Sequence, residues 1–332
     1  MGSGLRATDP NAVTIDVRLP PGGERTLRED VLDGLTRPFK EIPPKHFYDA
    51  RGSELFEQIC DLPEYYPTRT EGSILQSCAD QIAERTGATE LVELGAGYAT
   101  KTRILIDALE LERFIPVDVS ETTVRECARQ LVTEYPGLSV HGLVGDFERH
   151  LGHLPEPCGP RLVAFLGGTI GNFPPGSRRR FLRSIARTLG DDGWLLLGTD
   201  LVKEPGTLEA AYDDAAGVTA EFNLNVLHVM NRELGSDFDL DGFDHVAFWD
   251  AEREWIEMRL RSRRRQTVRF PDLDLTVHFD QREELRTEIS AKFTAQRVEG
   301  DFAAAGLELV DWFTDEDELF ALSLARVSAP AR

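Results

Sequence analysis

Short apolar runs alternate with helical patterns between Thr89 and Asp200, and this alternation constrains the fold more than any other feature of the chain. It is typical of βαβ units, in which crossover helices join parallel strands. The predicted strands are residues 90–94, 114–119, 138–144, 161–166 and 194–198, and the predicted helices between them are residues 101–109, 122–134 and 178–189. The pattern therefore predicts an α/β fold built on a doubly wound parallel sheet.

The pattern changes after Asp200. A helix is predicted over residues 208–230, and several strands without helices between them are predicted from His245 to Phe279. A strand at residues 288–293 and a helix at residues 298–305 follow. The last two predicted strands, residues 307–313 and 320–325, flank an acidic turn and read as a hairpin.

Two glycines, Gly95 and Gly97, directly follow the first predicted strand. Glycines here let the backbone turn tightly and approach a ligand at a helix N-terminus. A dinucleotide fingerprint needs a third glycine where this chain has Thr100, so the loop favours S-adenosylmethionine over NAD. Asp118 closes the second strand roughly 20 residues later, where a carboxylate meets ribose hydroxyls in such folds. Asp118 could instead cap the next helix, but Ser120 is already placed to serve as the N-cap.

Three further residues fit the same cofactor. Asp146 and Phe147 end the third strand and pair an acceptor for an exocyclic amine with an aromatic ring, which suits adenine. Lys101 opens the helix after the glycine loop, where the helix dipole disfavours a cation. A ligand carboxylate is therefore one explanation for Lys101, and an ordinary surface lysine is the other. We predict that S-adenosylmethionine is bound by Gly95, Gly97, Lys101, Asp118, Asp146 and Phe147.

These features together favour a Rossmann-like class I methyltransferase sheet, which has seven strands with the last antiparallel. The terminal hairpin supplies the two strands that the first five lack. We therefore predict a methyltransferase domain that binds S-adenosylmethionine, made of residues 70–201 plus 289–332. A second, α+β substrate-binding lobe is predicted from residues 17–69 plus 202–288. Residues 1–16 are expected to be flexible.

A glycine-rich turn ending in Asn172 follows the fourth strand, at the edge of the sheet where acceptors dock. From about residue 43 to its end, the chain resembles the histidine Nα-methyltransferases of ergothioneine biosynthesis, which form hercynine. The matching blocks are FYD at 47–49, LPEYYPTRTE at 62–71, VELGAGYATK at 92–101, FLGGTIGN at 165–172, YDDAAG at 212–217 and TEISAKF at 287–293. Six blocks in the same order make chance resemblance improbable. Tyr98 and Ala99 depart from the family pattern in the glycine loop.

The resemblance implies that histidine binds where the two lobes meet. The family's imidazole-binding Glu and Ser fall on Glu288 and Ser290, which lie two apart on a predicted strand and so share one face. The amino-acid clamp falls on Asn172 and Tyr212. Tyr65 is expected to act as the catalytic residue that holds the acceptor amine, because an aromatic face also holds a methylated cation. The remaining predicted substrate contacts are Tyr48, Gly167 and Met258, and core packing is the alternative role for Met258.

The formal net charge of −21 at pH 7 has the wrong sign for a partner coated with phosphates. We therefore expect a small-molecule substrate, L-histidine, and no nucleic-acid partner. No apolar run approaches the roughly 20 residues of a membrane span, and the chain starts without a secretory signal pattern. A cytoplasmic monomer without membrane contact is expected. Four widely spaced cysteines indicate free thiols, and Gly152 and Pro155 interrupt the His150–His153 pair, so no metal is expected.

The predicted reaction is the transfer of three methyl groups in succession to the α-amine of L-histidine. One alternative is a related amino-acid N-methyltransferase with a different acceptor. Another is a non-catalytic homologue that senses a ligand. A base-modifying enzyme is disfavoured by the charge and by the order Asn172-Phe173-Pro174-Pro175, because such enzymes carry Asn/Asp-Pro-Pro-aromatic at this place.

Overall fold

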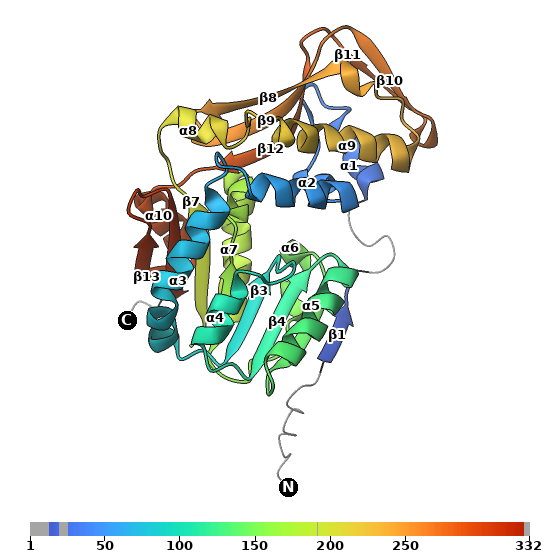
Figure 1. Ribbon diagram of the computed structural model, residues 1–332. Coiled ribbons are helices and arrows are strands. Elements are labelled where there is room, and N and C mark those ends of the chain that lie inside the picture. Colours follow the sequence, from blue (N-terminus) through green and yellow to red (C-terminus); the bar gives the residue numbers. More distant parts are fainter. Residues whose placement is uncertain (1–12, 20–25, 191, 329–332) are drawn as a thin grey trace.

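The computed structural model describes residues 13–19, 26–190 and 192–328. Its larger sheet has eight strands in the order β1–β5–β4–β3–β6–β7–β14–β13 (Figure 1). Their bounds are Val13–Val17 (β1), Glu90–Leu94 (β3), Arg113–Asp118 (β4), Ser139–Val144 (β5), Arg161–Phe165 (β6), Trp194–Asp200 (β7), Leu307–Thr314 (β13) and Phe320–Val327 (β14). The first six strands in this order pair in parallel, whereas β14 is antiparallel to β7 and β13. The predicted α/β fold with its terminal hairpin is confirmed.

Residues 13–16, which belong to the segment expected to be flexible, form most of strand β1. It pairs in parallel with β5, so that Val13 lies opposite Val140 and Val17 opposite Val144. Polar and apolar residues alternate along its five positions. Ile15 packs against the core, whereas Val13 and Val17 are exposed at this edge of the sheet. The remaining residues of that prediction, 1–12, lie outside the described part of the chain.

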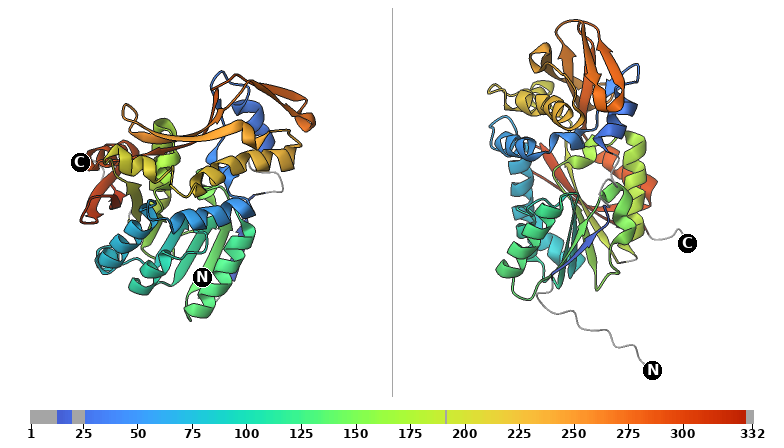
Figure 2. Two further views of the ribbon diagram at one scale, coloured as in Figure 1. Left: turned by 45° about the horizontal axis from the view of Figure 1, so that its top comes forward. Right: turned by 90° about the vertical axis from the view of Figure 1, so that its right-hand side faces the viewer.

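Helices cover both faces of the larger sheet (Figures 1 and 2). Helices α3 (Pro67–Thr86), α4 (Thr102–Ala108) and α5 (Glu121–Glu134) pack on one face, and α7 (Pro175–Leu189) and α10 (Ala295–Ala305) pack on the other. In β3, Leu91 points into the first of these cores, and Val92 and Leu94 point into the second. Because both faces are covered, strands such as β6 and β7 contain apolar runs without alternation, and their sequence signal is strong.

A second layer lies over the carboxyl ends of the parallel strands (Figure 1). It contains the sheet β2–β12–β9–β8 and the separate hairpin β10–β11. The strand bounds are Lys40–Glu41 (β2), Phe243–Asp250 (β8), Trp255–Ser262 (β9), Gln266–Phe270 (β10), Leu275–Phe279 (β11) and Glu284–Ala291 (β12). Helices α1 (Leu27–Gly34), α2 (Ala50–Cys60), α8 (Pro205–Ala210) and α9 (Val218–Leu234) contribute to the core of this layer. Strand β12 runs across the domain boundary predicted at residue 288.

The single helix predicted over residues 208–230 is wrong, because the structure has two helices, α8 and α9, with a break between them. Gly217 takes a φ of +78° directly before α9. The Asp214 carboxylate accepts hydrogen bonds from the backbone N–H groups of Val218 (3.0 Å) and Thr219 (2.7 Å) and so starts the new helix. Apolar periodicity continues through this break, and it therefore does not reveal the interruption.

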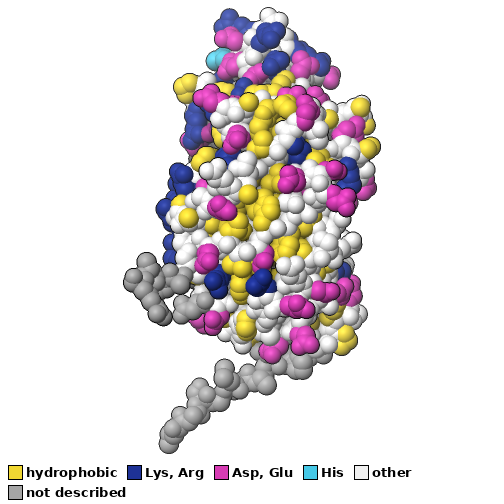
Figure 3. All heavy atoms as spheres, turned by 90° about the vertical axis from the view of Figure 1, so that its left-hand side faces the viewer, with side chains coloured by type: hydrophobic (Ala, Val, Ile, Leu, Met, Phe, Trp, Pro, Cys, Tyr) yellow, Lys and Arg dark blue, Asp and Glu magenta, His cyan; other side chains and the backbone are white. Residues whose placement is uncertain are grey.

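Figure 3 views the side of the molecule where β13 and α10 lie, and hydrophobic side chains form a band there among charged groups. Strand β13 is the edge of the larger sheet, and its residues 309–314 are half-buried. None of the helices in the described ranges combines the length and the hydropathy that a membrane-spanning segment requires.

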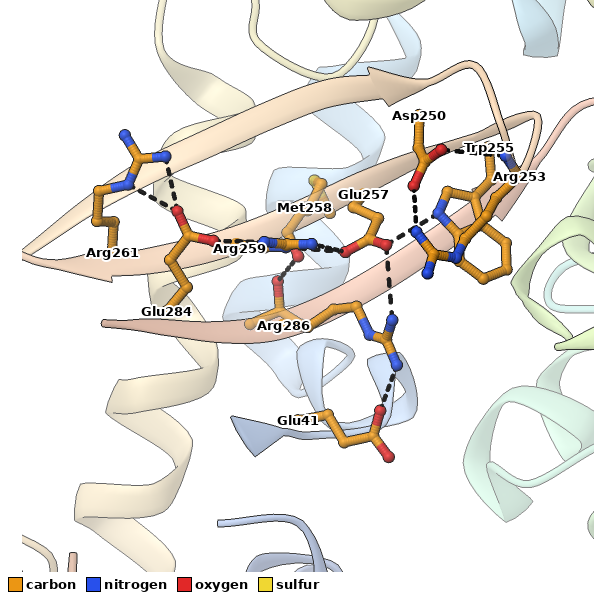
Figure 4. Close-up of polar contacts among 11 residues, drawn as sticks. Glu41, Asp250, Arg253, Trp255, Glu257, Met258, Arg259, Arg261, Glu284 and Arg286 are labelled. Atoms are coloured by element: carbon orange, nitrogen blue, oxygen red, sulfur yellow. Dashed lines mark hydrogen bonds and ion pairs between the residues drawn. The ribbon is translucent and has the colours of Figure 1, made fainter. Parts of the chain in front are cut away.

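The outer face of the four-stranded sheet carries a ladder of alternating arginines and glutamates (Figure 4). Glu284 of β12 binds two arginines of β9, Arg259 and Arg261. Glu257 accepts from the Arg259 guanidinium at 2.6 Å and from the Trp255 indole N–H at 2.9 Å. The ladder thus joins β12 to β9 through side chains on one face and leaves the opposite face of β12 for other contacts.

We expect Glu257→Ala to lower the free energy of unfolding by about 3 kcal/mol, because it removes a buried carboxylate and leaves its donors without this acceptor. Urea unfolding followed by circular dichroism measures the change. Arg265→Ala, which alters a side chain that is 85% exposed, serves as the control and should change stability by no more than about 0.5 kcal/mol. Equal effects of both substitutions would contradict a structural role for the ladder.

Candidate active site

The loop after β3 lies where the sheet changes direction, because the chain continues from β3 to β4 on one side and later adds β6 on the other. Ligands of open α/β sheets bind at this point, outside the carboxyl ends of the strands. Gly95 and Gly97 have φ values of +73° and +51°, a region that favours glycine. Ala99 also has a positive φ, +53°, and its side chain is buried, whereas Tyr98 is exposed. Three residues of the loop, Gly95, Gly97 and Ala99, therefore have left-handed backbone conformations.

Asp118 lies at the end of β4 and holds the glycine loop from the side. Its carboxylate accepts from the Gly97 N–H at 3.1 Å and from the Ser120 N–H at 2.9 Å. Ser120 is the N-cap of α5 and accepts from the Thr123 N–H, so Asp118 is not needed as the helix cap. A carboxylate has four acceptor positions, and two backbone donors leave capacity for ribose hydroxyls.

Asp146 and Phe147 come together beside the same loop. Asp146 is the N-cap of the short helix α6 (Phe147–His150) and accepts from the Glu148 N–H at 2.8 Å. The Phe147 ring packs against three other phenylalanines, and a β-carbon placed on Gly95 would lie 3.7 Å from that ring. An aromatic surface therefore borders the glycine turn, as a bound adenine requires.

Lys101 has a partner within the protein. Its ammonium pairs with the Glu71 carboxylate, which is completely buried on α3. The other oxygen of Glu71 accepts from the Gly167 N–H at 2.7 Å, in the turn after β6. Glu71 thus joins the glycine loop to the turn predicted to contact the substrate. Sequence reasoning gave Glu71 no role, although it lies on the apolar stripe of α3 with Ile74, Leu75 and Cys78, where a carboxylate is unusual.

Glu93, the penultimate residue of β3, is a second carboxylate that sequence reasoning did not assign. It is only 5% exposed, and among the described residues its Oε2 atom has no hydrogen-bond partner. Burial raises its pKa to about 8. A cationic group would satisfy this atom, and S-adenosylmethionine carries a sulfonium and an ammonium. The residues around the loop therefore fit this cofactor.

The predicted substrate residues gather on the inner side of the second layer. Tyr65 and Tyr212 have ring centroids 6.4 Å apart, and Tyr65 also contacts Phe56 at 6.2 Å. Tyr48 packs on Phe56 and on Phe222 of α9, each at 5.6 Å, and is 49% exposed. The three tyrosines and two phenylalanines form one aromatic cluster, to which the tyrosines contribute phenolic hydroxyls.

Glu288, Ser290 and Met258 share the inner face of the second sheet, because Glu288 lies opposite Met258 and Ser290 opposite Ile256. A bulge between Arg286 and Glu288 sets this register, and Met258 is fully buried in the core. Burial raises the pKa of Glu288 to about 7, while the charge of Lys292 and a hydrogen bond with Asn172 act in the opposite direction. Glu288 is therefore a carboxylate that still gains from a hydrogen-bond donor.

Asn172 reaches Glu288 because the 3-10 turn η3 (Thr169–Asn172) lies directly against β12. A β-carbon on Gly171 would come within 2.7 Å of the Ala291 carbonyl oxygen, so only glycine permits this approach. The predicted clamp is completed by Tyr212, whose hydroxyl lies 2.8 Å from Ser290 Oγ. Sequence reasoning missed Lys292 and Asp200, which lie immediately behind this pair.

The described part of the chain contains no group of three or more His, Cys, Asp or Glu side chains arranged to hold a metal ion. His150 Nδ1 instead lies 3.0 Å from the Asp146 backbone nitrogen. The four cysteines are free, as predicted.

The raised pKa of Glu93 predicts a pH-dependent stability. Between about pH 4.5 and pH 8 the unfolded chain has this carboxyl ionised while the folded protein keeps it protonated, so the free energy of unfolding falls as pH rises. Glu93→Gln removes the contribution of this carboxyl group to the pH dependence of the free energy of unfolding. The stability of the variant relative to the parent protein should increase by up to about 1 kcal/mol per pH unit across this window, as measured by urea unfolding.

Glu110→Gln, at an exposed position, is the control for that series and should show a constant difference. A constant difference for Glu93→Gln as well would contradict the buried, protonated state of Glu93.

Comparisons with known proteins agree with this geometry. The sequence model of the family described as "Histidine-specific methyltransferase, SAM-dependent" matches residues 27–327. The chain is 54% identical over 303 residues to the histidine N-alpha-methyltransferase of Mycolicibacterium smegmatis, covering 90% of this chain and 94% of the relative. It is 51% identical over 307 residues to the Mycobacterium tuberculosis protein of the same name, covering 91% and 95%.

A more distant relative is the ergothioneine biosynthesis protein 1 of Schizosaccharomyces pombe. It is 31% identical to the chain over 243 residues. The match covers 69% of this chain and 31% of that longer protein.

Proposed function

The chain belongs to the family of S-adenosylmethionine-dependent, histidine-specific methyltransferases, and we propose that it converts L-histidine to hercynine by three methylations of the α-amine, the first step of ergothioneine biosynthesis. S-Adenosylmethionine is the methyl donor in this family. The observation that carries the proposal is the position of Glu288 and Ser290 on one face of β12, beside Asn172 and Tyr212.

We assign cofactor binding to the loop after β3. The backbone at Gly95 and Gly97 would follow the amino-acid part of the cofactor, Asp118 would accept from the ribose hydroxyls, and Asp146 with Phe147 would hold the adenine. The Lys101 ammonium would bind the cofactor carboxylate while it remains near Glu71. When bound, the cofactor supplies a methyl group on a sulfonium centre.

The protein's own contribution is alignment, because an in-line displacement needs a neutral amine lone pair aimed at the methyl carbon. In each transfer a nitrogen–carbon bond forms while the sulfur–carbon bond breaks. The product amine must release a proton to water before the next transfer. A neighbouring sulfonium lowers the pKa of the acceptor amine by disfavouring a second cation. The Tyr65 ring would offer a face to the increasingly methylated amine, and Tyr48 and Gly167 would make further contacts with the substrate.

Glu288 is proposed to select histidine. An ionised carboxylate accepts an imidazole N–H. Because the pKa of Glu288 is about 7, this carboxyl group is partly protonated when no substrate is bound. Since the ionised form is the stronger acceptor for this bond, histidine binding should strengthen as pH rises through about 7. Asn172 and Tyr212 would then hold the amino-acid backbone of the substrate.

The activity is tested by incubating the protein with S-adenosylmethionine and a panel of free amino acids and following product mass. Histidine should gain up to three methyl groups and should be the best acceptor. A better acceptor elsewhere in the panel would replace histidine and favour a related amino-acid N-methyltransferase. Calorimetric binding of both ligands without turnover would favour a ligand sensor instead.

The role of Glu288 is tested by Glu288→Ala. The loss of a charged hydrogen bond should raise the KM for histidine about tenfold to a hundredfold and should leave the Kd of S-adenosylmethionine within about twofold. Glu299→Ala, which removes an exposed carboxylate of α10, is the control, with a KM close to that of the parent protein. An unchanged ranking of acceptors in Glu288→Ala would remove the assigned role.

A further inference from the structure

Behind the predicted acceptor clamp lies a buried cluster of two lysines, one aspartate and two tyrosines that the proposed reaction does not yet use. Lys292 directly follows β12, two residues after Ser290, and is completely buried. Its ammonium contacts Asp200 Oδ2 at 2.8 Å, Tyr212 Oη at 2.9 Å and Ser290 Oγ at 2.9 Å. On the far side of Asp200, Lys203 lies 2.6 Å from Oδ1.

These contacts account for every donor of Lys292. An ammonium has three N–H groups and no acceptor, and three oxygen atoms surround this one. Each of the hydroxyl oxygens of Tyr212 and Ser290 therefore accepts from a cation. The two hydroxyls also lie 2.8 Å from each other, so one of their two protons lies between them. One hydroxyl proton remains, and it is the pair's single donor for a bound acceptor.

We propose that Lys292 is a positioning residue that makes the Tyr212–Ser290 pair a one-proton donor aimed at the bound acceptor. Its two N–H bonds, together with the bond between the hydroxyls, occupy three of the four acceptor lone pairs of the two oxygens. The pair then favours a group with a lone pair, such as a carboxylate oxygen or an unprotonated imidazole nitrogen. Donation by a cation also strengthens the remaining O–H as a donor. This inference rests on the proposed function only for the identity of the acceptor.

The same contacts suggest a second role, a proton path from the clamp through Lys292 and Asp200 to Tyr66, whose hydroxyl lies 2.8 Å from Asp200 Oδ1. The electrostatics oppose it. Burial by itself lowers the pKa of Lys292, but the charge of Asp200 and the hydrogen bonds to Asp200 and Tyr212 outweigh burial and hold the pKa above its ordinary value. A lysine kept as a cation is a permanent donor and a poor relay.

Asp200 makes the arrangement tolerant of mutation at Lys292. The cluster holds two ammonium groups and one carboxylate, and Lys203 stays paired with Asp200 when Lys292 is replaced. Lys292→Met therefore removes the second positive charge and leaves no carboxylate without a partner. The variant is expected to fold, and circular dichroism with S-adenosylmethionine calorimetry checks this.

The matched control is Lys203→Met. It also replaces a lysine that pairs with Asp200. Lys203 contacts Tyr66, Asp200 and the Leu201 carbonyl. In the described structure it makes no contact with Tyr212 or Ser290. Lys292→Met should raise the KM for histidine about tenfold or more, with the Kd of S-adenosylmethionine within twofold. Lys203→Met should stay within about twofold of the parent KM. Equal increases in both variants would show a general charge effect and overturn the proposal.

A double-mutant cycle tests whether Lys292 acts through the hydroxyls. In the Tyr212→Phe/Ser290→Ala background, adding Lys292→Met should change the KM by less than about twofold, because the groups that it positions are gone. The same tenfold increase in both backgrounds would overturn the proposal. The cycle is measured on the acceptor that the parent protein methylates best, so a failure of the histidine assignment is seen in the parent protein alone.

Discussion

One buried carboxylate, that of Glu71, determines how the two halves of the candidate site lie relative to each other. It contacts Lys101 in the loop after β3 and the Gly167 N–H in the turn after β6, and both segments approach it from the carboxyl end of the sheet. Strand β7 passes so close that a β-carbon on Gly198 would lie 2.2 Å from its Oε1 atom. A buried charge tolerates little loss of partners, so these segments keep a fixed spacing. A fixed spacing between donor loop and acceptor turn is what in-line transfer requires.

The two faces of strand β12 carry different kinds of side chain. The outer face carries Glu284 and Arg286 in the ladder of ion pairs, and the inner face carries Glu288 and Ser290. Lys292 directly follows the strand and contacts Ser290. The bulge before Glu288 changes the register between these two parts. The ion pairs therefore join the strands on the outer face, and the polar groups of the inner face remain available for other contacts.

Local pattern was sufficient to predict the central sheet, because strands such as β6 and β7 are buried on both faces and contain continuous apolar runs. It failed between α8 and α9, where the Asp214 side chain caps a new helix inside an unbroken apolar pattern. The glycine loop and Asn172 were recognisable from their spacing and from family resemblance, and their ligand roles remain predictions. The partners of Glu71 were not recognisable, because they lie 30 and 96 residues away along the chain and only the folded protein brings them together.

The buried carboxylates differ in how much positive charge and how many hydrogen-bond donors the protein places beside them. This difference separates structural carboxylates from those available to a ligand. Burial opposes ionisation of Asp200, but the charges of Lys292 and Lys203 outweigh it and lower its pKa, so Asp200 is committed to structure. Glu93 and Glu288 have raised pKa values, about 8 and about 7, because burial outweighs their nearby partners. A ligand that brings a positive charge or an N–H group stabilises the ionised form of such a carboxyl, and binding then releases a proton. Glu93 lies beside the cofactor loop and Glu288 beside the acceptor clamp, so each proposed ligand meets a carboxylate that ionises most readily when that ligand is bound.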